Sequence, residues 1–125
     1  MPGLTLDAGA LIAVDRQDRR ILVLLARARE TGAVVTVPAT ALAQAVRTPA
    51  RQARLARLVR QPTTDVVALD RVDATNVGRL LAASATADIV DAHVVICARR
   101  ARQHVATSDP DGLRRLDRSL PLIAL

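Results

Sequence analysis

The chain has 125 residues, half of them hydrophobic, which is the length of one domain with an ordinary core. Its formal net charge is +6, and it contains no lysine and no aromatic residue. We find neither a secretion signal nor the roughly 20 consecutive apolar residues that a membrane span requires, and the single cysteine excludes an internal disulfide and a cysteine-based zinc cage. We therefore expect a cytoplasmic protein without membrane association.

The basic residues are all arginine, whose planar guanidinium suits phosphate and carboxylate groups. A nucleic acid or an acidic protein is therefore an expected partner. The alternative explanation is a GC-rich genome, which favours arginine over lysine. Because aromatic residues are absent, base-stacking platforms are disfavoured, and any RNA contact is expected to run through arginine and backbone groups.

Hydrophobic periodicity, capping residues and prolines predict strands that alternate with helices. In chain order, we predict a strand at 3–6, helices at 8–14 and 16–31, a strand at 33–37, helices at 38–46 and 48–60, a strand at 65–69, helices at 70–83 and 88–102, a strand at 104–107, a helix at 110–118 and a strand at 120–125. This alternation predicts an α/β fold: one domain over residues 1–125, with a central, mostly parallel sheet of about five strands and helices on both faces.

Three aspartates stand where predicted elements meet. Asp7 follows the first strand, Asp91 lies three residues after Asp88 at the start of a helix, and Asp109 follows the fourth strand. The carboxyl ends of parallel strands lie at one edge of a sheet, so these acids can converge there. Converging carboxylates repel one another unless a cation neutralises them, and hard oxygen ligands suit Mg²⁺ or Mn²⁺ rather than zinc. Taken singly, each aspartate is also explained as a helix N-cap.

Other acid-based α/β folds fit the residues less well. Receiver domains need a lysine, which the chain lacks, and haloacid-dehalogenase-like phosphatases need Asp-x-Asp after the first strand, where Asp7 is followed by Ala8-Gly9. No glycine-rich phosphate loop is present, so nucleoside triphosphatases are excluded.

The ordered set of acidic segments resembles PIN-domain proteins. Residues 4–13 resemble the opening of that family, and residues 88–95 and 105–113 resemble its third and fourth acidic motifs. The resemblance covers essentially the whole chain. It is nearest to the compact VapC-type ribonuclease toxins of bacterial toxin–antitoxin systems.

This resemblance implies a Mg²⁺- or Mn²⁺-dependent endoribonuclease in which Asp7, Asp91 and Asp109 are the catalytic metal ligands. It also implies RNA cleavage by metal-activated water, a cognate antitoxin and a homodimer. The family's second acid, usually a glutamate, is replaced by Gln44, which keeps an oxygen ligand but loses a charge. Asp88 and Asp111 are candidates to compensate for that loss.

Further residues keep two interpretations. Arg47, Arg51 and Arg54 belong to a basic stripe that is either an RNA phosphate track or a solvated face. Thr107 is expected either to hydrogen-bond a ligand or a metal-bound water, or to cap a helix. Cys97 is expected to be inert core and His93 to pack or lie on the surface.

Two alternative functions stay open at this point. The first is a degenerate PIN domain that binds RNA or a protein partner without cleaving, which is motivated by Gln44. The second is a non-nuclease α/β module in which the aspartates serve only as helix caps.

Overall fold

The structure, a computed structural model, describes residues 3–125, so Met1 and Pro2, on which part of the secretion-signal prediction rests, lie outside it. The strands are β1 (Leu4–Leu6), β2 (Val35–Pro38), β3 (Thr64–Val67), β4 (His104–Thr107) and β5 (Leu122–Ala124). The α-helices are α1 (Ala8–Asp15), α2 (Arg19–Thr31), α3 (Ala39–Ala45), α4 (Ala53–Val59), α5 (Arg71–Ser84), α6 (Ile89–Ala101) and α7 (Pro110–Leu116), and a short 3₁₀ helix, η1, covers Pro49–Arg51.

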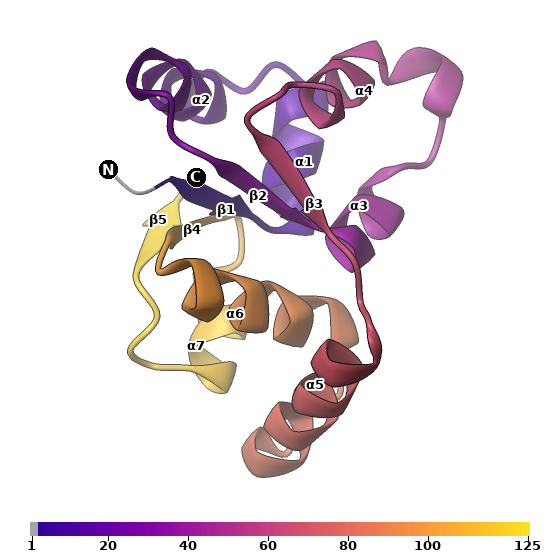
Figure 1. The fold of residues 1–125 in the computed structure, drawn as a ribbon, viewed down its shortest axis with the longest axis vertical. Coiled ribbons are helices and arrows are strands. Elements are labelled where there is room, and N and C mark those ends of the chain that lie inside the picture. Colours follow the sequence, from indigo (N-terminus) through magenta and orange to yellow (C-terminus); the bar gives the residue numbers. More distant parts are fainter. Residues whose placement is uncertain (1–2) are drawn as a thin grey trace.

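The five strands form one sheet in the order β3-β2-β1-β4-β5, and every neighbouring pair is parallel. Right-handed crossovers place the helices after β1 and β2 on one face of this sheet and those after β3 and β4 on the other. Figure 1 shows this arrangement, with α1, α2 and α4 on one side and α5, α6 and α7 on the other. The helix α3 packs against both α1 and α6. The predicted α/β class is confirmed.

The hydrophobic side chains of the core are aliphatic, apart from Cys97, because the chain has no Phe, Tyr or Trp. β1, β2 and β4 are almost completely buried between the two helical layers, as expected for the inner strands of a parallel sheet. The helix α6 contributes the most buried face of any helix, and it packs on β1, β2 and β4. The largest fully buried hydrophobic side chains are Leu4, Leu6, Leu11, Ile21, Leu55, Leu113, Val37, Val94, Val95 and Val105.

One predicted helix is broken in the structure. The segment predicted as a continuous helix over 48–60 consists of η1 and α4, with a non-helical residue, Gln52, between them. The Gln52 side chain is buried, and its Oε1 accepts hydrogen bonds from the backbone N–H groups of Arg47 and Thr48 at 2.9 and 3.1 Å. Its Nε2 donates to the Ala45 carbonyl at 2.9 Å. These three bonds satisfy the backbone of the α3–η1 turn and hold Gln52 out of the helix.

No single helix within residues 3–125 is long and apolar enough to cross a membrane. Only α5 and α6 taken together pass on length and composition, and they are bent by 110° at the break between them.

The aliphatic core predicts a large difference between buried and exposed leucines. Leu11 of α1 is fully buried, whereas Leu22 of α2 is 40% exposed. We expect Leu11→Ala to lower the free energy of unfolding by about 2–5 kcal/mol, through lost burial and the cavity left behind. The control Leu22→Ala should change it by about 0.5 kcal/mol. Urea denaturation measures both, and equal losses would contradict the placement of α1 over the sheet.

Candidate metal centre at the carboxyl edge of the sheet

The aspartates predicted as metal ligands lie where the strand order reverses. The chain moves outward from β1 to β2 and β3 in one direction and from β4 to β5 in the other, so β1 and β4 are neighbours at the switch point. Ligand sites of open parallel sheets lie at such points, beyond the carboxyl ends of the strands. Asp7 follows β1, and its backbone N–H donates to the Ala106 carbonyl of β4 at 3.4 Å. Asp109 follows β4, so both acids occupy this edge.

Helix capping orients three of these side chains. Asp7 Oδ1 accepts from the Ala10 N–H at 2.8 Å at the start of α1, and Asp109 Oδ1 accepts from the Gly112 N–H at 3.2 Å at the start of α7. Asp88 Oδ1 accepts from the Asp91 N–H at 2.9 Å at the start of α6. Each of these capping bonds is made by a single carboxylate oxygen, Oδ1. The capping interpretation is therefore correct locally, and it is compatible with a metal site.

Electrostatic coupling shows that Asp91 belongs to the same cluster. Burial, together with the negative charges of Asp88, Asp7 and Asp109, raises the pKa of Asp91 from 3.8 to about 6. Carboxylates raise one another's pKa only when they are close together with little solvent between them. The fold thus brings Asp91, which lies on α6, to the acids that follow β1 and β4.

The pKa of Asp7 is also raised, chiefly by burial and further by the charge of Asp109. Hydrogen bonds from the Thr107 hydroxyl and from the backbone N–H groups of Ala10 and Gly9 oppose this shift. The Thr107 side chain also accepts from the Asp109 N–H at 2.9 Å. The predicted supporting residue Thr107 therefore contacts both strand-end acids.

Two glycines make room for neighbouring polar side chains at this edge of the sheet. A Cβ atom at Gly9 would collide with the Ser108 hydroxyl, and one at Gly112 would collide with the Asp109 carboxylate. Because Gly9 has no side chain, the segment after β1 can lie against the segment after β4. Because Gly112 has none, the Asp109 carboxylate has room to cap α7.

The cluster carries uncompensated negative charge. The salt bridges found within residues 3–125 involve the acids Asp73 and Asp117, and none pairs a cation with Asp7, Asp91 or Asp109. Raised pKa values and the lack of a cationic partner fit a site that binds a divalent cation, which would favour the charged forms. The donors are all hard oxygens, the set that Mg²⁺ and Mn²⁺ prefer.

The other predicted residues lie at varying distances from this centre. Asp111 is an exposed residue in the first turn of α7, and Gln44 is exposed on α3, which begins at the end of β2 on the same edge. Arg47 and Arg51 are exposed between α3 and α4. Arg54 lines a cavity of about 450 Å³ with residues at the starts of β2 and β3, which is the opposite edge of the sheet.

A second group of possible metal ligands was not found from the sequence. Asp73, His93 and Cys97 are buried between α5 and α6, and their ligand atoms all lie within 4.8 Å of one another. In the sequence, Asp73 looks like an ordinary acid in the first turn of a helix. The spacing of His93 and Cys97, one turn apart on an apolar helix, was the only sequence feature that indicated a pair of ligands. The packing of α5 on α6 then brings Asp73 to this pair.

An all-parallel five-stranded sheet with acids at its switch point defines this chain as an α/β domain of PIN-like architecture. The fold is similar to that of one chain in the crystal structure of VapBC2 from Rickettsia felis bound to a DNA fragment from their promoter. The TM-score is 0.69 over 98% of this chain and 98% of that chain, with 12% sequence identity. No protein-family model matches the sequence, and a search of curated proteins finds no match. The predicted resemblance to a VapC-type PIN domain is thus confirmed at the level of the fold.

The raised pKa of Asp91 predicts a pH-dependent stability. Between pH 3.8, its reference pKa, and about 6, its pKa in the fold, the folded chain binds more protons than the unfolded chain. Without divalent cations, the contribution of Asp91 to the free energy of unfolding should therefore fall as the pH rises through this window, by about 1–2 kcal/mol once solvent screening is allowed for. Asp91→Asn should remove this contribution and leave those of Asp7, whose pKa is raised, and His93, whose pKa is lowered. Asp15→Asn, at the far end of α1, should keep the Asp91 contribution. Urea denaturation at pH 4.5 and 7.5 measures the effect. If the free energy of unfolding changed with pH as much in Asp91→Asn as in the wild type, the placement of Asp91 in the acid cluster would be contradicted.

Proposed function

We propose that this chain is a VapC-like toxin, acting as a Mg²⁺- or Mn²⁺-dependent endoribonuclease in the cytoplasm, with residues 1–125 forming a single PIN-like domain. The observation that carries the proposal is the acid cluster at the β1–β4 switch point. Its carboxylates raise one another's pKa and have no cationic partner among the described residues. A fold like that of a VapBC2 chain supports the same conclusion.

In this proposal, Asp7, Asp91 and Asp109 hold the cation through their carboxylate oxygens. A divalent ion there lowers the pKa of a bound water and neutralises charge on the scissile phosphate. Asp88 adds negative charge beside Asp91 and fixes the start of α6. Thr107 orients Asp7 by hydrogen bonding and fixes the backbone of Asp109. The products would carry a 5′-phosphate and a 3′-hydroxyl.

Gln44 weakens the site relative to one with a glutamate. It is exposed on α3, at the edge of the sheet that carries the acids. An amide oxygen is a poorer ligand for a hard cation than a carboxylate because it carries no charge. We therefore propose a site of lower metal affinity, with Asp88 and Asp111 supplying the additional negative charge.

The RNA contact is proposed to begin at the exposed arginines near α3. The Arg47 guanidinium donates to the Ala43 and Val46 carbonyls at 3.0 and 2.8 Å, which ends α3 and places positive charge there. Arg51 follows in η1. Arg54 lines the cavity at the opposite edge of the sheet, so we leave it out of the proposed RNA contact. Phosphate contacts of this kind give affinity without base specificity, which suits a chain that has no aromatic residue for stacking.

The proposed protein partners are a cognate antitoxin and a second copy of the chain. The solved structure with the similar fold is a VapBC2 complex, which supports a protein partner of the antitoxin kind. An acidic cluster beside arginines would accept an arginine-bearing inhibitory segment as well as RNA.

A second candidate function is RNA or protein binding without cleavage, and Gln44 is the observation that favours it. In that case the acid cluster would bind a cation too weakly to activate water. The cap-only alternative requires that the cluster bind no cation.

Substitution of single acids tests the nuclease. We expect Asp7→Asn, Asp91→Asn and Asp109→Asn each to reduce Mn²⁺-dependent RNA cleavage by more than about 100-fold, because even outer partners of a metal site contribute about 10- to 100-fold. Asp15→Asn, a matched acid on α1 outside the cluster, should retain activity. Cleavage of a labelled RNA pool, analysed on gels, provides the readout. Equal activity in the wild type and Asp7→Asn, or no activity in either, would contradict the nuclease proposal.

Magnesium titration by calorimetry separates the alternatives if no cleavage is seen. Heat that is present in the wild type and lost in Asp7→Asn indicates a non-cleaving domain with an intact cation site. No heat in either protein indicates acids that serve only as caps.

Restoring the missing charge tests the role of Gln44. We expect Gln44→Glu to raise the affinity for Mg²⁺ by about 10-fold, since one more anionic ligand is available to the cation. The Mg²⁺ concentration that supports half-maximal cleavage should fall accordingly. Gln61→Glu, outside the carboxyl edge, is the control for net charge. No change in the magnesium dependence of Gln44→Glu would show that Gln44 lies outside the site.

A further inference from the structure

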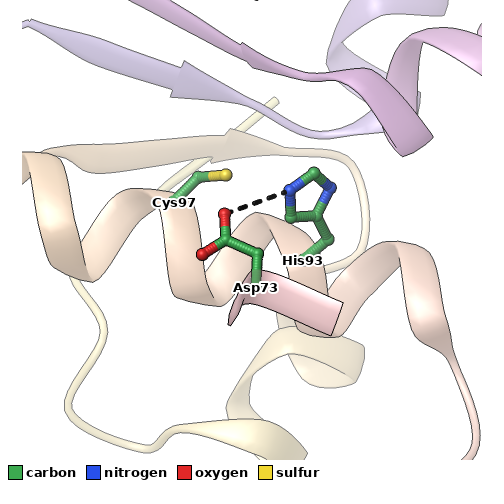
Figure 2. A group of neighbouring side chains, drawn as sticks. All are labelled: Asp73, His93 and Cys97. Atoms are coloured by element: carbon green, nitrogen blue, oxygen red, sulfur yellow. Dashed lines mark ion pairs between the residues drawn. The ribbon is translucent and has the colours of Figure 1, made fainter. Parts of the chain in front are cut away.

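A second cluster of ligand-type side chains lies inside the protein, between α5 and α6. His93 and Cys97 stand one turn apart on α6 and face Asp73 in the first turn of α5. Figure 2 shows the three side chains pointing toward one another. Their exposed fractions are 0% for His93, 2% for Cys97 and 3% for Asp73, so the cluster is sealed from solvent. Their ligand atoms all lie within 4.8 Å of one another.

Two polar atoms in this cluster have no hydrogen-bond partner. His93 Nε2 and Asp73 Oδ2 are both buried and both unsatisfied. They face each other at 3.9 Å, which is too long for a direct hydrogen bond. An unpaired buried polar atom costs roughly 1–3 kcal/mol, and this cluster has two such atoms facing each other. A ligand bound between them would satisfy both atoms.

The backbone carbonyl of Ala68 also lies near the His93 ring, but neither neutral tautomer gives Nε2 a hydrogen bond of normal geometry. Its other ring nitrogen, Nδ1, lies 2.7 Å from the Thr40 hydroxyl. If Nδ1 donates to Thr40, the lone pair of Nε2 points at the negative Asp73 oxygen, and the two repel. If the Thr40 hydroxyl donates to Nδ1 instead, the Nε2 proton points at an oxygen that is out of hydrogen-bond range. The first tautomer is the one that a metal-bound histidine adopts.

We propose that Asp73, His93 and Cys97 form a site for one divalent transition metal of the zinc class, bound through Asp73 Oδ2, His93 Nε2 and Cys97 Sγ. One oxygen, one nitrogen and one sulfur are a borderline-soft set that suits zinc or cobalt and not magnesium. In a tetrahedral zinc site, neighbouring ligand atoms are about 3.3 to 3.6 Å apart. The observed separations need only small side-chain rotations to reach these values.

The surroundings resemble the outer partners of a metal site. Thr40 Oγ1 would accept from Nδ1–H and hold the His93 ring in place. Arg100 forms an ion pair with the other Asp73 oxygen, Oδ1, and so leaves Oδ2 directed at the cluster. The Asp73 backbone N–H donates to Asp70 Oδ1 at 2.8 Å, which fixes the first turn of α5. Three ligands leave a fourth position for water.

The raised pKa of the Cys97 thiol fits a metal ligand better than a reactive nucleophile. Burial raises the pKa of the Cys97 thiol to about 12, so without a metal the sulfur keeps its proton. Binding replaces that proton with the cation and releases it to solvent, because the thiolate is the ligand. Thiolate and carboxylate together then balance the two positive charges of the ion. Such a site would join α5 to α6 and stabilise the helix that carries Asp91.

Cobalt substitution tests the site directly. Co²⁺ is added to refolding mixtures of the full chain carrying Asp7→Asn and Asp109→Asn, which disables the acid cluster and leaves the α5–α6 cluster unchanged. We expect one Co²⁺ per chain, with a thiolate-to-cobalt charge-transfer band and intense tetrahedral d–d bands in the absorption spectrum. Zn²⁺ should displace the cobalt and raise Tm. Because Cys97 is the only cysteine, the charge-transfer band can come from no other residue.

Matched variants assign the ligands. Cys97→Ser should abolish the charge-transfer band, and Thr40→Val, which removes only the hydroxyl beside Nδ1, should weaken Co²⁺ binding by about 10-fold while keeping the band. Far-ultraviolet circular dichroism checks that both variants fold. If Cys97→Ser does not fold, the spectrum of the parent protein still shows whether the thiolate binds cobalt. The proposal is overturned if the folded parent shows no charge-transfer band, in which case only a water lies between Asp73 and His93.

Discussion

The parallel pairing of β1 with β4 is the constraint on which the candidate metal centre depends. This pairing places Asp7 and Asp109 at adjacent strand ends, and the backbone bond from Asp7 to Ala106 holds those ends together. Burial raises the pKa of Asp7 and Asp91, and the charges of neighbouring acids raise it further. The charged carboxylates therefore carry an electrostatic cost that a cation would relieve, at the position where open parallel sheets usually bind their ligands.

The helix α6 links this centre to the rest of the molecule. Its first turn carries Asp91, and its buried middle packs on β1, β2 and β4. The same helix carries His93 and Cys97 on the side that meets α5. One rigid element thus holds ligands of both candidate sites, hard oxygen at its exposed start and softer nitrogen and sulfur within the core. Its orientation is therefore important for both.

Much of the fold follows from local sequence features. Alternating apolar segments, N-cap aspartates and prolines predicted every strand and helix in order, because each element is defined by its own periodicity and ends. The exception is the break at Gln52, whose side chain bonds to backbone groups five, four and seven residues earlier. Periodicity does not record such bonds, so the helix over 48–60 was predicted as continuous.

The sequence by itself determined the alternation of elements, the aliphatic core, the acids at the strand and helix junctions, and a resemblance that named their class. Tertiary structure decided which of these acids share one environment: burial and the charge of the nearby Asp88 raise the pKa of Asp91, and the charges of Asp7 and Asp109, distant in sequence, raise it further. It also decided that Arg54 faces the opposite edge and that Asp73 meets His93 and Cys97. The physical reason is that charge coupling and ligand geometry depend on distance in space, whereas periodicity and capping depend on neighbours along the chain.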